Sequence, residues 1–218
     1  VVYSDGEDRR VVSAAAKLIR EGLVEPILIG DPEKVRAALQ ESGETGVSLQ
    51  VVNPYNPALL QHNAAEYMSI QKDKGKDISE EEAIKAVKNP LAAGALMVRR
   101  GEAEIGVAGN LSSTADVIRA GLRMVGTAAG SKTVSSFFFM LKDNNVCMFT
   151  DCAVIPEPTS AQLADIAIST AGVYKRVMGD EARVALLSFS TKGSAKHERV
   201  DKVRAALEEI KTREPNLL

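Results

Sequence analysis

The sequence has no tryptophan, and it has few cysteines and histidines, the residues that most often build metal and redox sites. It contains two cysteines and two histidines in 218 residues, and aromatic residues make up 4% of it. Cys147 and Cys152 have no histidines near them, and their odd spacing would place them on opposite faces of a strand, so they are poor metal ligands. We expect two buried, reduced thiols and no bound metal. His62 and His197 lack any partner pattern and are typical of surface residues.

Long runs of like charge and long apolar runs are also absent. The 27 basic and 29 acidic residues give a net charge of −2, and no five or six like charges follow one another. Bulk attraction to nucleic acid or to an anionic membrane is therefore excluded, because both need clustered basic residues. No apolar run reaches the roughly 18 residues of a membrane span, and no signal peptide opens the chain. The start at Val1, inside a strand-like run, is interpreted as trimmed, and the composition predicts a cytoplasmic globular protein.

Short apolar runs alternate with longer segments of helical period over most of the chain. Strands are expected at residues 1–3, 26–30, 47–52 and 103–109, and helices at residues 9–21, 31–42, 57–74, 79–88, 90–100 and 112–122. Asp31 before Pro32, and Ser79 with Glu82 in a capping box, mark two helix starts. This alternation predicts an α/β fold with a mostly parallel sheet that helices cover on both faces.

The alternation breaks near residue 135. Two apolar runs flank the "KDNN" turn and predict a hairpin. A long helix over residues 159–178, a buried strand at residues 184–189 and a last helix follow, with His197 one turn into that helix. We predict an N-terminal α/β lobe over residues 1–134 and a second α/β lobe over residues 135–218. Ligands are expected in a cleft between the lobes, at the carboxyl ends of the strands.

Three strand-to-helix loops have a composition that suits an anion site. They are "SDGEDRR" at residues 4–10, "GNLSST" at residues 109–114, and "STKGSA" at residues 190–195. Each would place small or hydroxyl residues at a helix N-terminus, where unpaired N–H groups attract anions. Simpler alternatives stay open: the first loop is also typical of a solvated surface loop, the second of helix capping, and the third suits a cap or an anion cradle equally.

Common nucleotide and hydrolase motifs are missing from these loops. Lys192 precedes Gly193, which is the reverse of a Walker loop, and neither Gly-x-Gly-x-x-Gly nor Gly-x-Ser-x-Gly occurs. Asp151, at the end of a strand, is typical of a turn residue.

Several segments, in order along nearly the whole chain, resemble the phosphate acetyl/butyryltransferase family. They are "GEDRR", "EPILIG", "NPLAAGALMVRRGEAEIGVAG", "SSTADVIRA", "VSSFFFM", "FTDCAV", "PTSAQLADIAI" and "LLSFSTKGSAKHERVDKVRAA". The resemblance implies a two-lobe, three-layer α/β/α fold like that of isocitrate and isopropylmalate dehydrogenases, with the site in the cleft and a homodimeric assembly. It also implies reversible acetyl transfer between coenzyme A and inorganic phosphate, with acetyl-CoA and phosphate as substrates and no tightly bound cofactor.

The resemblance also suggests which residues bind the substrates. Arg119 matches an arginine implicated in binding coenzyme A or phosphate. The other positions expected to meet the phosphate or the acyl group are Ser113, Thr114, Ser136, Ser190, Thr191, Lys192, Gly193 and Ser194.

The sequence departs from the family pattern in two places. Gln71 stands where the family has a second arginine, and Lys72 or Lys74 would lack the two-pronged guanidinium fork. The family continues, after the part that this chain resembles, with segments containing "DGE", "ANV" and "NDLSRG", which carry the expected catalytic groups. These later segments are not among the residues given, and the "DGE" at residues 5–7 belongs to the first loop. We therefore expect an incomplete second lobe, catalytic residues outside this stretch, and little activity from it alone.

Three alternatives to acetyl transfer remain at this point. They are a butyryl or broader acyl transferase, a non-catalytic acetyl-CoA-binding regulatory domain as in malic enzymes, and a folded piece without activity.

Overall fold

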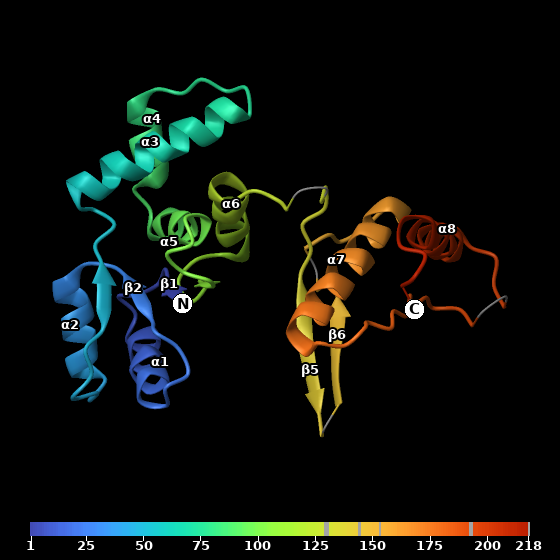
Figure 1. Ribbon diagram of the computed structural model, residues 1–218, viewed down its shortest axis with the longest axis horizontal. Coiled ribbons are helices and arrows are strands. Elements are labelled where there is room, and N and C mark those ends of the chain that lie inside the picture. Colours follow the sequence, from blue (N-terminus) through green and yellow to red (C-terminus); the bar gives the residue numbers. More distant parts are fainter. Residues whose placement is uncertain (129–130, 144, 153, 192–193, 218) are drawn as a thin grey trace. The chain divides into compact units, whose positions relative to one another are not determined.

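A computed structural model describes residues 1–128, 131–143, 145–152, 154–191 and 194–217 of the chain. The chain forms two compact units, Val1–Gly126 and Thr127–Leu218 (Figure 1). The first unit ends at Gly126, eight residues before the division predicted at residue 134. We describe each unit by itself.

The first unit is built on a parallel four-stranded sheet. Its strands are β1 (Val2–Tyr3), β2 (Ile27–Ile29), β3 (Gln50–Val52) and β4 (Gly106–Val107), in the order β3-β2-β1-β4. All the pairs are parallel, with Val2 opposite both Ile27 and Gly106. The chain therefore leaves β1 toward β2 and β3, and later returns to the other side of β1 as β4. The expected mostly parallel sheet is confirmed.

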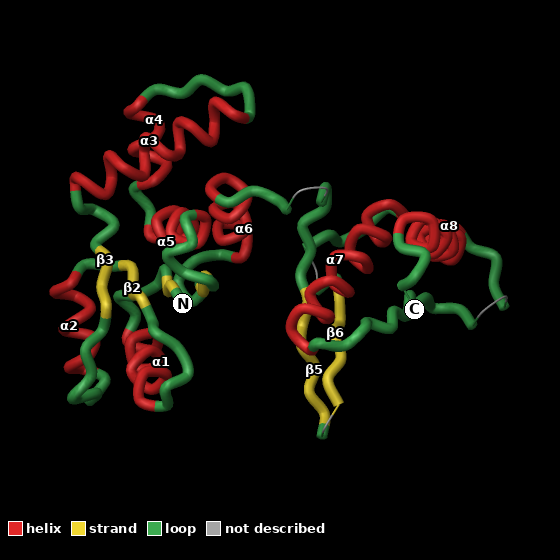
Figure 2. The backbone as a smooth tube through the Cα atoms, viewed as in Figure 1, coloured by secondary structure: helices red, strands yellow, loops and turns green. Residues whose placement is uncertain are grey.

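Helices separate these strands, as the apolar periodicity predicts. They are α1 (Arg9–Arg20), α2 (Pro32–Glu41), α3 (Pro57–Asp73), α4 (Glu80–Val87), α5 (Pro90–Arg99) and α6 (Thr114–Met124). Asp31 caps α2 by accepting hydrogen bonds from the backbone N–H groups of Glu33 and Lys34. Ser79 and Glu82 form the predicted capping box at the start of α4. Figure 2 shows the helices around the sheet strands of this unit.

The two faces of the sheet have different partners. Leu28 packs with Val12 and Val35, from α1 and α2. Its neighbour Ile29 packs with Ala93 of α5 in a separate cluster. Because successive side chains of a strand point to opposite faces, this division places α1 and α2 on one face and α5 on the other.

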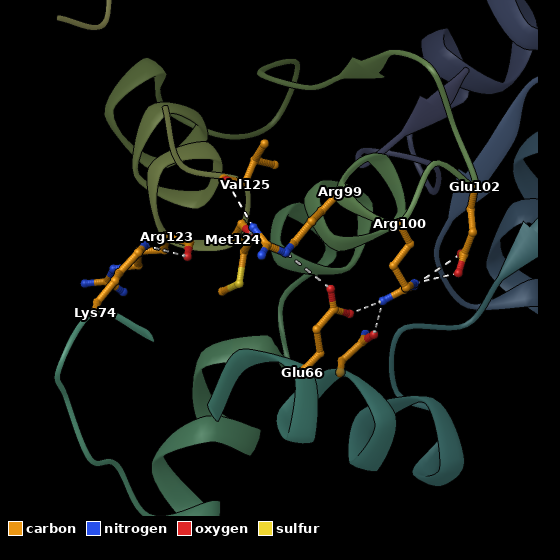
Figure 3. A network of polar contacts seen from close by, with 9 residues as sticks. Glu66, Lys74, Arg99, Arg100, Glu102, Arg123, Met124 and Val125 are labelled. Carbon is orange, nitrogen blue, oxygen red and sulfur yellow. Dashed lines mark hydrogen bonds and ion pairs between the residues drawn. The ribbon is translucent and has the colours of Figure 1, made fainter. Parts of the chain in front are cut away.

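A polar network joins α5 to α3 and to the end of α6 (Figure 3). The Arg99 guanidinium donates to the Met124 and Val125 carbonyls at 3.4 and 3.2 Å, where the carbonyls of α6 lack helical partners. Arg100 donates to Glu66 of α3 at 2.8 Å and to Glu102 at 2.5 Å. These contacts hold α6, the helix that carries Arg119, against the body of the first unit.

The second unit contains a hairpin and two helices. Strands β5 (Phe137–Lys142) and β6 (Asn145–Thr150) pair antiparallel, which confirms the predicted hairpin. Helices α7 (Ser160–Met178) and α8 (Glu198–Arg213) pack together, with Ala164, Ala167 and Ile210 buried between them. Thr159 is the N-cap of α7, where the sequence allowed either Thr159 or Ser160.

The expected buried strand at residues 184–189 is wrong. These residues form no strand, and the side chains of Leu187 and Phe189 are 86% and 68% exposed. Val184 and Leu186 are partly buried while Arg183, Ala185 and Leu187 are exposed, which is the alternation of an extended chain. In the described part of the chain no strand pairs with this segment, so its backbone has no ladder to join.

The expected burial of both cysteines is also wrong. Cys147 is exposed on β6, and Cys152, which lies just beyond the end of that strand, is half-buried. Cys147 is exposed because a two-stranded hairpin covers little of its own surface. Among the residues that the structure describes, no helix has the length and apolarity to cross a membrane.

Candidate functional site

The first and second predicted loops meet at the carboxyl ends of β1 and β4. Oδ2 of Asp5 accepts hydrogen bonds from the backbone N–H groups of Gly109 at 3.0 Å and Asn110 at 2.9 Å. Asp5 is 8% exposed, and Ser4 and Gly6 beside it are also buried. The first loop is therefore not simply a solvated one: its first half is buried against the second loop.

Close backbone packing forms the base of this loop. A Cβ atom added to Gly6 would lie 2.7 Å from the carbonyl oxygen and 2.8 Å from the nitrogen of Ile29, both main-chain atoms. A Cβ on Gly94 of α5 would lie 2.6 Å from the Ser4 hydroxyl. Only glycine fits at these distances, so the two glycines let the loop lie directly on β2 and α5.

The charged side chains that follow in this loop form ion pairs and hydrogen bonds within the protein. Glu7 accepts from the Asp31 backbone N–H at 2.9 Å and from the Lys34 ammonium at 3.0 Å. Asp8 is the N-cap of α1, and the Arg10 guanidinium donates to both of its oxygens. That hydrogen bond lowers the pKa of Asp8 to about 2. Arg10 is thus engaged by an acid rather than presented to an anionic ligand.

A small cavity of about 190 Å³ lies beside these loops. It is lined by Ser4, Asp5, Gly6, Glu7, Ile29, Tyr55, Asn89, Pro90, Leu91, Leu111 and Ser112. The strand order reverses between β1 and β4, and in open parallel sheets ligands bind outside the carboxyl ends of strands at such a reversal. Sequence reasoning did not single out Asp5, Tyr55 or Asn89, although all three follow strands or precede helices.

The start of α6 borders this cavity through Leu111 and Ser112 and holds three of the predicted residues. Ser113 is the N-cap: its Oγ accepts from the Asp116 backbone N–H at 3.2 Å and donates to the Asp116 carboxylate at 2.7 Å. The Arg119 guanidinium donates to the same carboxylate at 2.5 Å. The Ser113 hydroxyl, with help from Arg119, lowers the pKa of Asp116.

Thr114 is the first residue of α6, and the Arg119 side chain is 53% exposed. Ser113, Thr114 and Arg119 therefore lie together on the exposed first turns of one helix. The capping alternative for this loop is confirmed, and Arg119 remains accessible to a ligand.

Ser136 lies in the second unit and is engaged by Asp151. Its backbone N–H and its hydroxyl both donate to Oδ1 of Asp151 at 2.8 Å, and its Oγ accepts from the Cys152 N–H at 3.0 Å. Oδ2 of Asp151 accepts from the Ile155 N–H at 2.7 Å. Burial opposes the ionisation of Asp151, but these donors outweigh it, so its pKa lies below the usual range. Asp151 thus ties the start of β5 to the end of β6.

The third loop bonds to itself in its described part. The hydroxyls of Ser190 and Ser194 lie 2.9 Å apart, and the Ser194 hydroxyl donates to the Thr191 carbonyl at 2.7 Å. Lys192 and Gly193 lie outside the described residues. The loop does not cap the last helix, which begins at Glu198 with His197 as its N-cap. Both the placement of this loop at a helix start and the placement of His197 inside the helix are wrong.

Gln71, which stands where the family has an arginine, is buried. Gln71 is 7% exposed within α3. Lys74, one of the two expected substitutes, donates from its ammonium to the Leu122 carbonyl at 3.4 Å. It also donates to the Arg123 carbonyl at 3.5 Å (Figure 3). Lys74 thus serves the end of α6, while Lys72 is exposed. Among the described residues no group of three or more His, Cys, Asp or Glu side chains forms a possible metal site.

Comparison with known proteins gives a match along the whole chain. Residues 1–218 match the model of the family described as phosphate acetyl/butaryl transferase. The chain is 37% identical over 223 residues to a phosphate acetyltransferase of Clostridium acetobutylicum, covering 100% of this chain and 66% of the relative. It is also 37% identical to a phosphate acetyltransferase of Thermoanaerobacterium thermosaccharolyticum, covering 100% of this chain and 67% of the relative.

Solved structures agree with these relatives. A phosphotransacetylase from Streptococcus pyogenes superposes with a TM-score of 0.88 at 36% identity, over 100% of this chain and 65% of the other. The EutD phosphotransacetylase from Staphylococcus aureus gives a TM-score of 0.86 at 34% identity, over 99% and 65%. The chain thus spans about two thirds of the length of the relatives it matches.

Proposed function

The chain belongs to the phosphate acetyl/butaryl transferase family, and from this premise we propose that the protein transfers an acetyl group between coenzyme A and inorganic phosphate. Acetyl-CoA and phosphate would give acetyl phosphate and coenzyme A, in a reversible reaction. The observation that carries the proposal is the family match over residues 1–218. Relatives named phosphate acetyltransferase, at 37% identity, support the acetyl group over longer acyl chains.

The reaction needs positioning and charge stabilisation more than a bound cofactor. A phosphate oxygen attacks the thioester carbon, the C–S bond breaks, and the sulfur leaves as thiolate and takes a proton. Hydrogen-bond donors that stabilise the tetrahedral oxyanion, and groups that hold the two substrates together, supply most of the rate in such transfers. We assign the residues described below to the holding of substrates. The groups that move the proton belong, in this proposal, outside residues 1–218.

Arg119 is the residue proposed to bind the phosphate group of a substrate. Its planar guanidinium can donate two parallel hydrogen bonds to a phosphate, which a lysine cannot do. In the free protein it pairs with Asp116 on an exposed helix surface. Exposed ion pairs contribute about 0–1 kcal/mol, so exchange of the Asp116 carboxylate for a dianionic phosphate costs little.

Serine and threonine hydroxyl groups beside Arg119 and in the third loop are proposed to donate further hydrogen bonds to the substrates. Ser113 and Thr114 lie within two turns of Arg119 on α6. Ser190, Thr191, Lys192, Gly193 and Ser194 would supply hydroxyls and an ammonium to phosphate or to the acyl oxygen. Ser136 would act mainly by fixing Asp151, because its hydroxyl already donates to that carboxylate.

The finer expectations for the fold and the assembly belong to the same proposal. They are a two-lobe, three-layer architecture like that of isocitrate and isopropylmalate dehydrogenases with substrates bound in its cleft, a homodimer, and a cytoplasmic location. No tightly bound cofactor is proposed, since coenzyme A enters and leaves as a substrate.

Steady-state kinetics with two thioesters test the proposal. The protein that contains residues 1–218, as its gene encodes it, would be assayed for thiol release from acetyl-CoA and from butyryl-CoA in the presence of phosphate. We expect phosphate-dependent release with a higher kcat/KM for acetyl-CoA. A higher kcat/KM for butyryl-CoA would favour a butyryltransferase. Calorimetric binding of acetyl-CoA without any turnover would favour a regulatory domain, and either result would overturn the proposal.

A further inference from the structure

Asp5 carries a buried carboxylate that none of the proposed substrate contacts uses. The residue is 8% exposed and lies at the carboxyl end of β1. Backbone hydrogen bonds fix its neighbours on both sides. The Ser4 N–H donates to the Val107 carbonyl of β4 at 3.0 Å. The Gly6 N–H donates to the Ile29 carbonyl of β2 at 3.2 Å. Asp5 therefore has a fixed place on the sheet, beside the ends of β2 and β4.

The second loop presents two successive backbone N–H groups to one oxygen of Asp5. Oδ2 accepts hydrogen bonds from Gly109 at 3.0 Å and from Asn110 at 2.9 Å. Gly109 has a φ of +104°, in the region that favours glycine. Successive N–H groups that converge in this way form a concavity that binds anions. In this loop the protein supplies the anion from its own chain, and hydrogen bonds to a carboxylate are stronger than those to a neutral acceptor.

The far end of α6, which follows this loop, is anchored by apolar packing and by basic side chains. Among the 11 described residues of α6 only Met124 is buried, in a cluster with residues of α3, α4 and α5. Arg99 donates to two backbone carbonyls at this end and Lys74 donates to two more (Figure 3). This end of the helix is therefore held independently of Asp5.

The first turns of α6, by contrast, contain no buried residue among those described and continue directly from the second loop. The N-cap Ser113 follows Asn110 closely in the chain. A Cβ atom on Gly109 would lie 3.8 Å from a methyl group of Val117, so the loop also packs against the helix that it starts. The loop and the start of the helix thus form one packed piece, which Asp5 ties to the sheet.

We propose that Asp5 is a positioning residue for substrate binding: its carboxylate holds the second loop on the sheet and thereby sets the position of Arg119. Asp5 itself contacts no substrate in this proposal. A displacement of about 1 Å in a positioned group can cost a large factor in rate. A fixed helix start therefore matters to an arginine that donates two parallel hydrogen bonds to a phosphate. The inference rests on the proposed function, in which Arg119 binds the phosphate group of a substrate.

Steady-state kinetics of the gene-encoded protein test the proposal. Arg119→Ala identifies the substrate, phosphate or acetyl-CoA, whose KM depends on this arginine. Asp5→Ala should raise the same KM about fivefold with kcat unchanged, because a misplaced arginine weakens binding in the ground state and the transition state alike. Asp5→Asn keeps an oxygen that can accept both N–H bonds, so its KM should stay within about twofold of the original. An unchanged KM in Asp5→Ala would overturn the proposal. A fall in kcat in Asp5→Asn would also overturn it, because it would show contact with the reacting atoms.

Gly109→Ala disturbs the same contact from its exposed side, and it keeps the test decisive if the buried Asp5→Ala variant does not fold. At a φ of +104° an alanine is strained, so the N–H groups of residues 109 and 110 should shift away from Asp5. The same KM should rise about threefold, again with kcat unchanged. An unchanged KM in this variant would count against the proposal as directly as one in Asp5→Ala.

A double-mutant cycle shows whether Asp5 acts through Arg119. If it does, the variant with both Asp5→Ala and Arg119→Ala should have the KM of Arg119→Ala alone to within about twofold, because an absent side chain cannot be misplaced. Multiplication of the two KM increases would show two independent effects and would overturn the proposal.

Asp31 provides a matched control in the same unit. One oxygen of its carboxylate also accepts two successive backbone N–H groups, those of Glu33 at 2.9 Å and Lys34 at 3.2 Å, but at the start of α2. Asp31→Ala should lower the stability of the protein, as the loss of a helix cap does, and leave both KM values unchanged. Equal KM increases in Asp31→Ala and Asp5→Ala would reflect a general loss of stability and would contradict the proposal.

Amide hydrogen exchange tests the contact without relying on turnover. In Asp5→Ala the N–H groups of Gly109 and Asn110 should exchange at least about tenfold faster, while the amide of Met124 at the anchored end of α6 should keep its rate. In Asp5→Asn all three rates should stay close to the original. The two proposals can therefore fail separately. Absence of acetyl transfer by the unsubstituted protein would refute the proposed function, whereas unchanged exchange at both loop amides in Asp5→Ala would refute the positioning role of Asp5.

Discussion

Both units of the chain contain short apolar runs and long helices, yet among the described residues only the first forms a parallel sheet with helices on both faces. In the first unit β1 has a strand on each side and helices above and below. In the second unit β6 has one partner, and the apolar segment after α7 has none among the described residues. An apolar run becomes a strand only where a neighbouring edge is available. Local sequence specifies the helices of both units, whereas the sheet depends on contacts made far along the chain.

The largest loss of stability is expected from a substitution that breaks the polar network of the first unit. Arg100→Ala should reduce the free energy of unfolding by roughly 3 kcal/mol, because it removes the donor to Asn63 and leaves Glu66, in a mostly buried position, with only the more distant Arg99 at 3.6 Å. The Arg100 side chain is only 16% exposed and donates to both. Urea unfolding followed by circular dichroism would measure it. Arg36→Ala is the control: Arg36 pairs with Glu33 in an exposed position, and no change is expected.

A smaller loss should follow from Gly6→Ala in the same unit. The added Cβ would meet the main chain of Ile29 at 2.7 and 2.8 Å, and backbone cannot move aside, so a loss of about 2 kcal/mol is expected. Gly121→Ala is the matched control, since its Cβ would meet nothing within 4 Å and alanine favours the helix interior. That variant should gain about 0.5–1 kcal/mol. Equal losses for both would contradict the tight packing of the first loop on β2.

Much of this fold is predictable from sequence, and the failures have a common cause. The caps Asp31, Ser79 and Thr159 act through residues two or three positions away, so sequence reveals them. The failed strand at 184–189 needs a partner edge, which local sequence does not report. Asp5 lies in the first predicted loop, but its contact was not predictable for the same reason: its carboxylate accepts hydrogen bonds from Gly109 and Asn110, more than a hundred positions along the chain. Long-range pairing, rather than local propensity, limits the prediction.

The predicted site residues also divide into those whose contacts are local, and so predictable, and those whose contacts are not. Ser113 caps α6 and contacts Asp116, as their capping-box spacing in the sequence indicated, but the contact of Arg119 with Asp116 became visible only in the structure. His197 takes the cap of α8 because its Nδ1 accepts from the Arg199 N–H at 3.1 Å. An imidazole at that position gives a weaker sequence signal than serine or aspartate.

A kinetic prediction concerns α6 of the first unit. Arg119→Ala in the protein encoded by the gene should raise the KM for phosphate or for coenzyme A about tenfold, the loss of roughly one charge-assisted hydrogen-bond pair. Arg123→Ala is the matched control, because Arg123 is also exposed on α6, one turn further along. An unchanged KM in Arg119→Ala, or equal effects in both variants, would remove Arg119 from the binding site.

The smallest expected effect concerns pH and the second unit. The folded-state pKa of Asp151 lies below its ordinary value of 3.8, so its ionised form stabilises the fold. This contribution is fully present above pH 3.8 and is lost as the pH falls through the lower folded value. Asp151→Asn should therefore make the decline in stability toward low pH shallower. Denaturant midpoints of both proteins between about pH 2 and 6 would measure it, and identical pH profiles would contradict the role of Ser136 and Ile155 as donors.

The central claim, acetyl transfer to phosphate, has one direct test. Phosphorus NMR would follow the gene-encoded protein with acetyl-CoA and inorganic phosphate. We expect an acetyl phosphate resonance that grows only when both substrates are present, together with an equal release of coenzyme A. Release of coenzyme A without acetyl phosphate, or no reaction although acetyl-CoA binds, would contradict it.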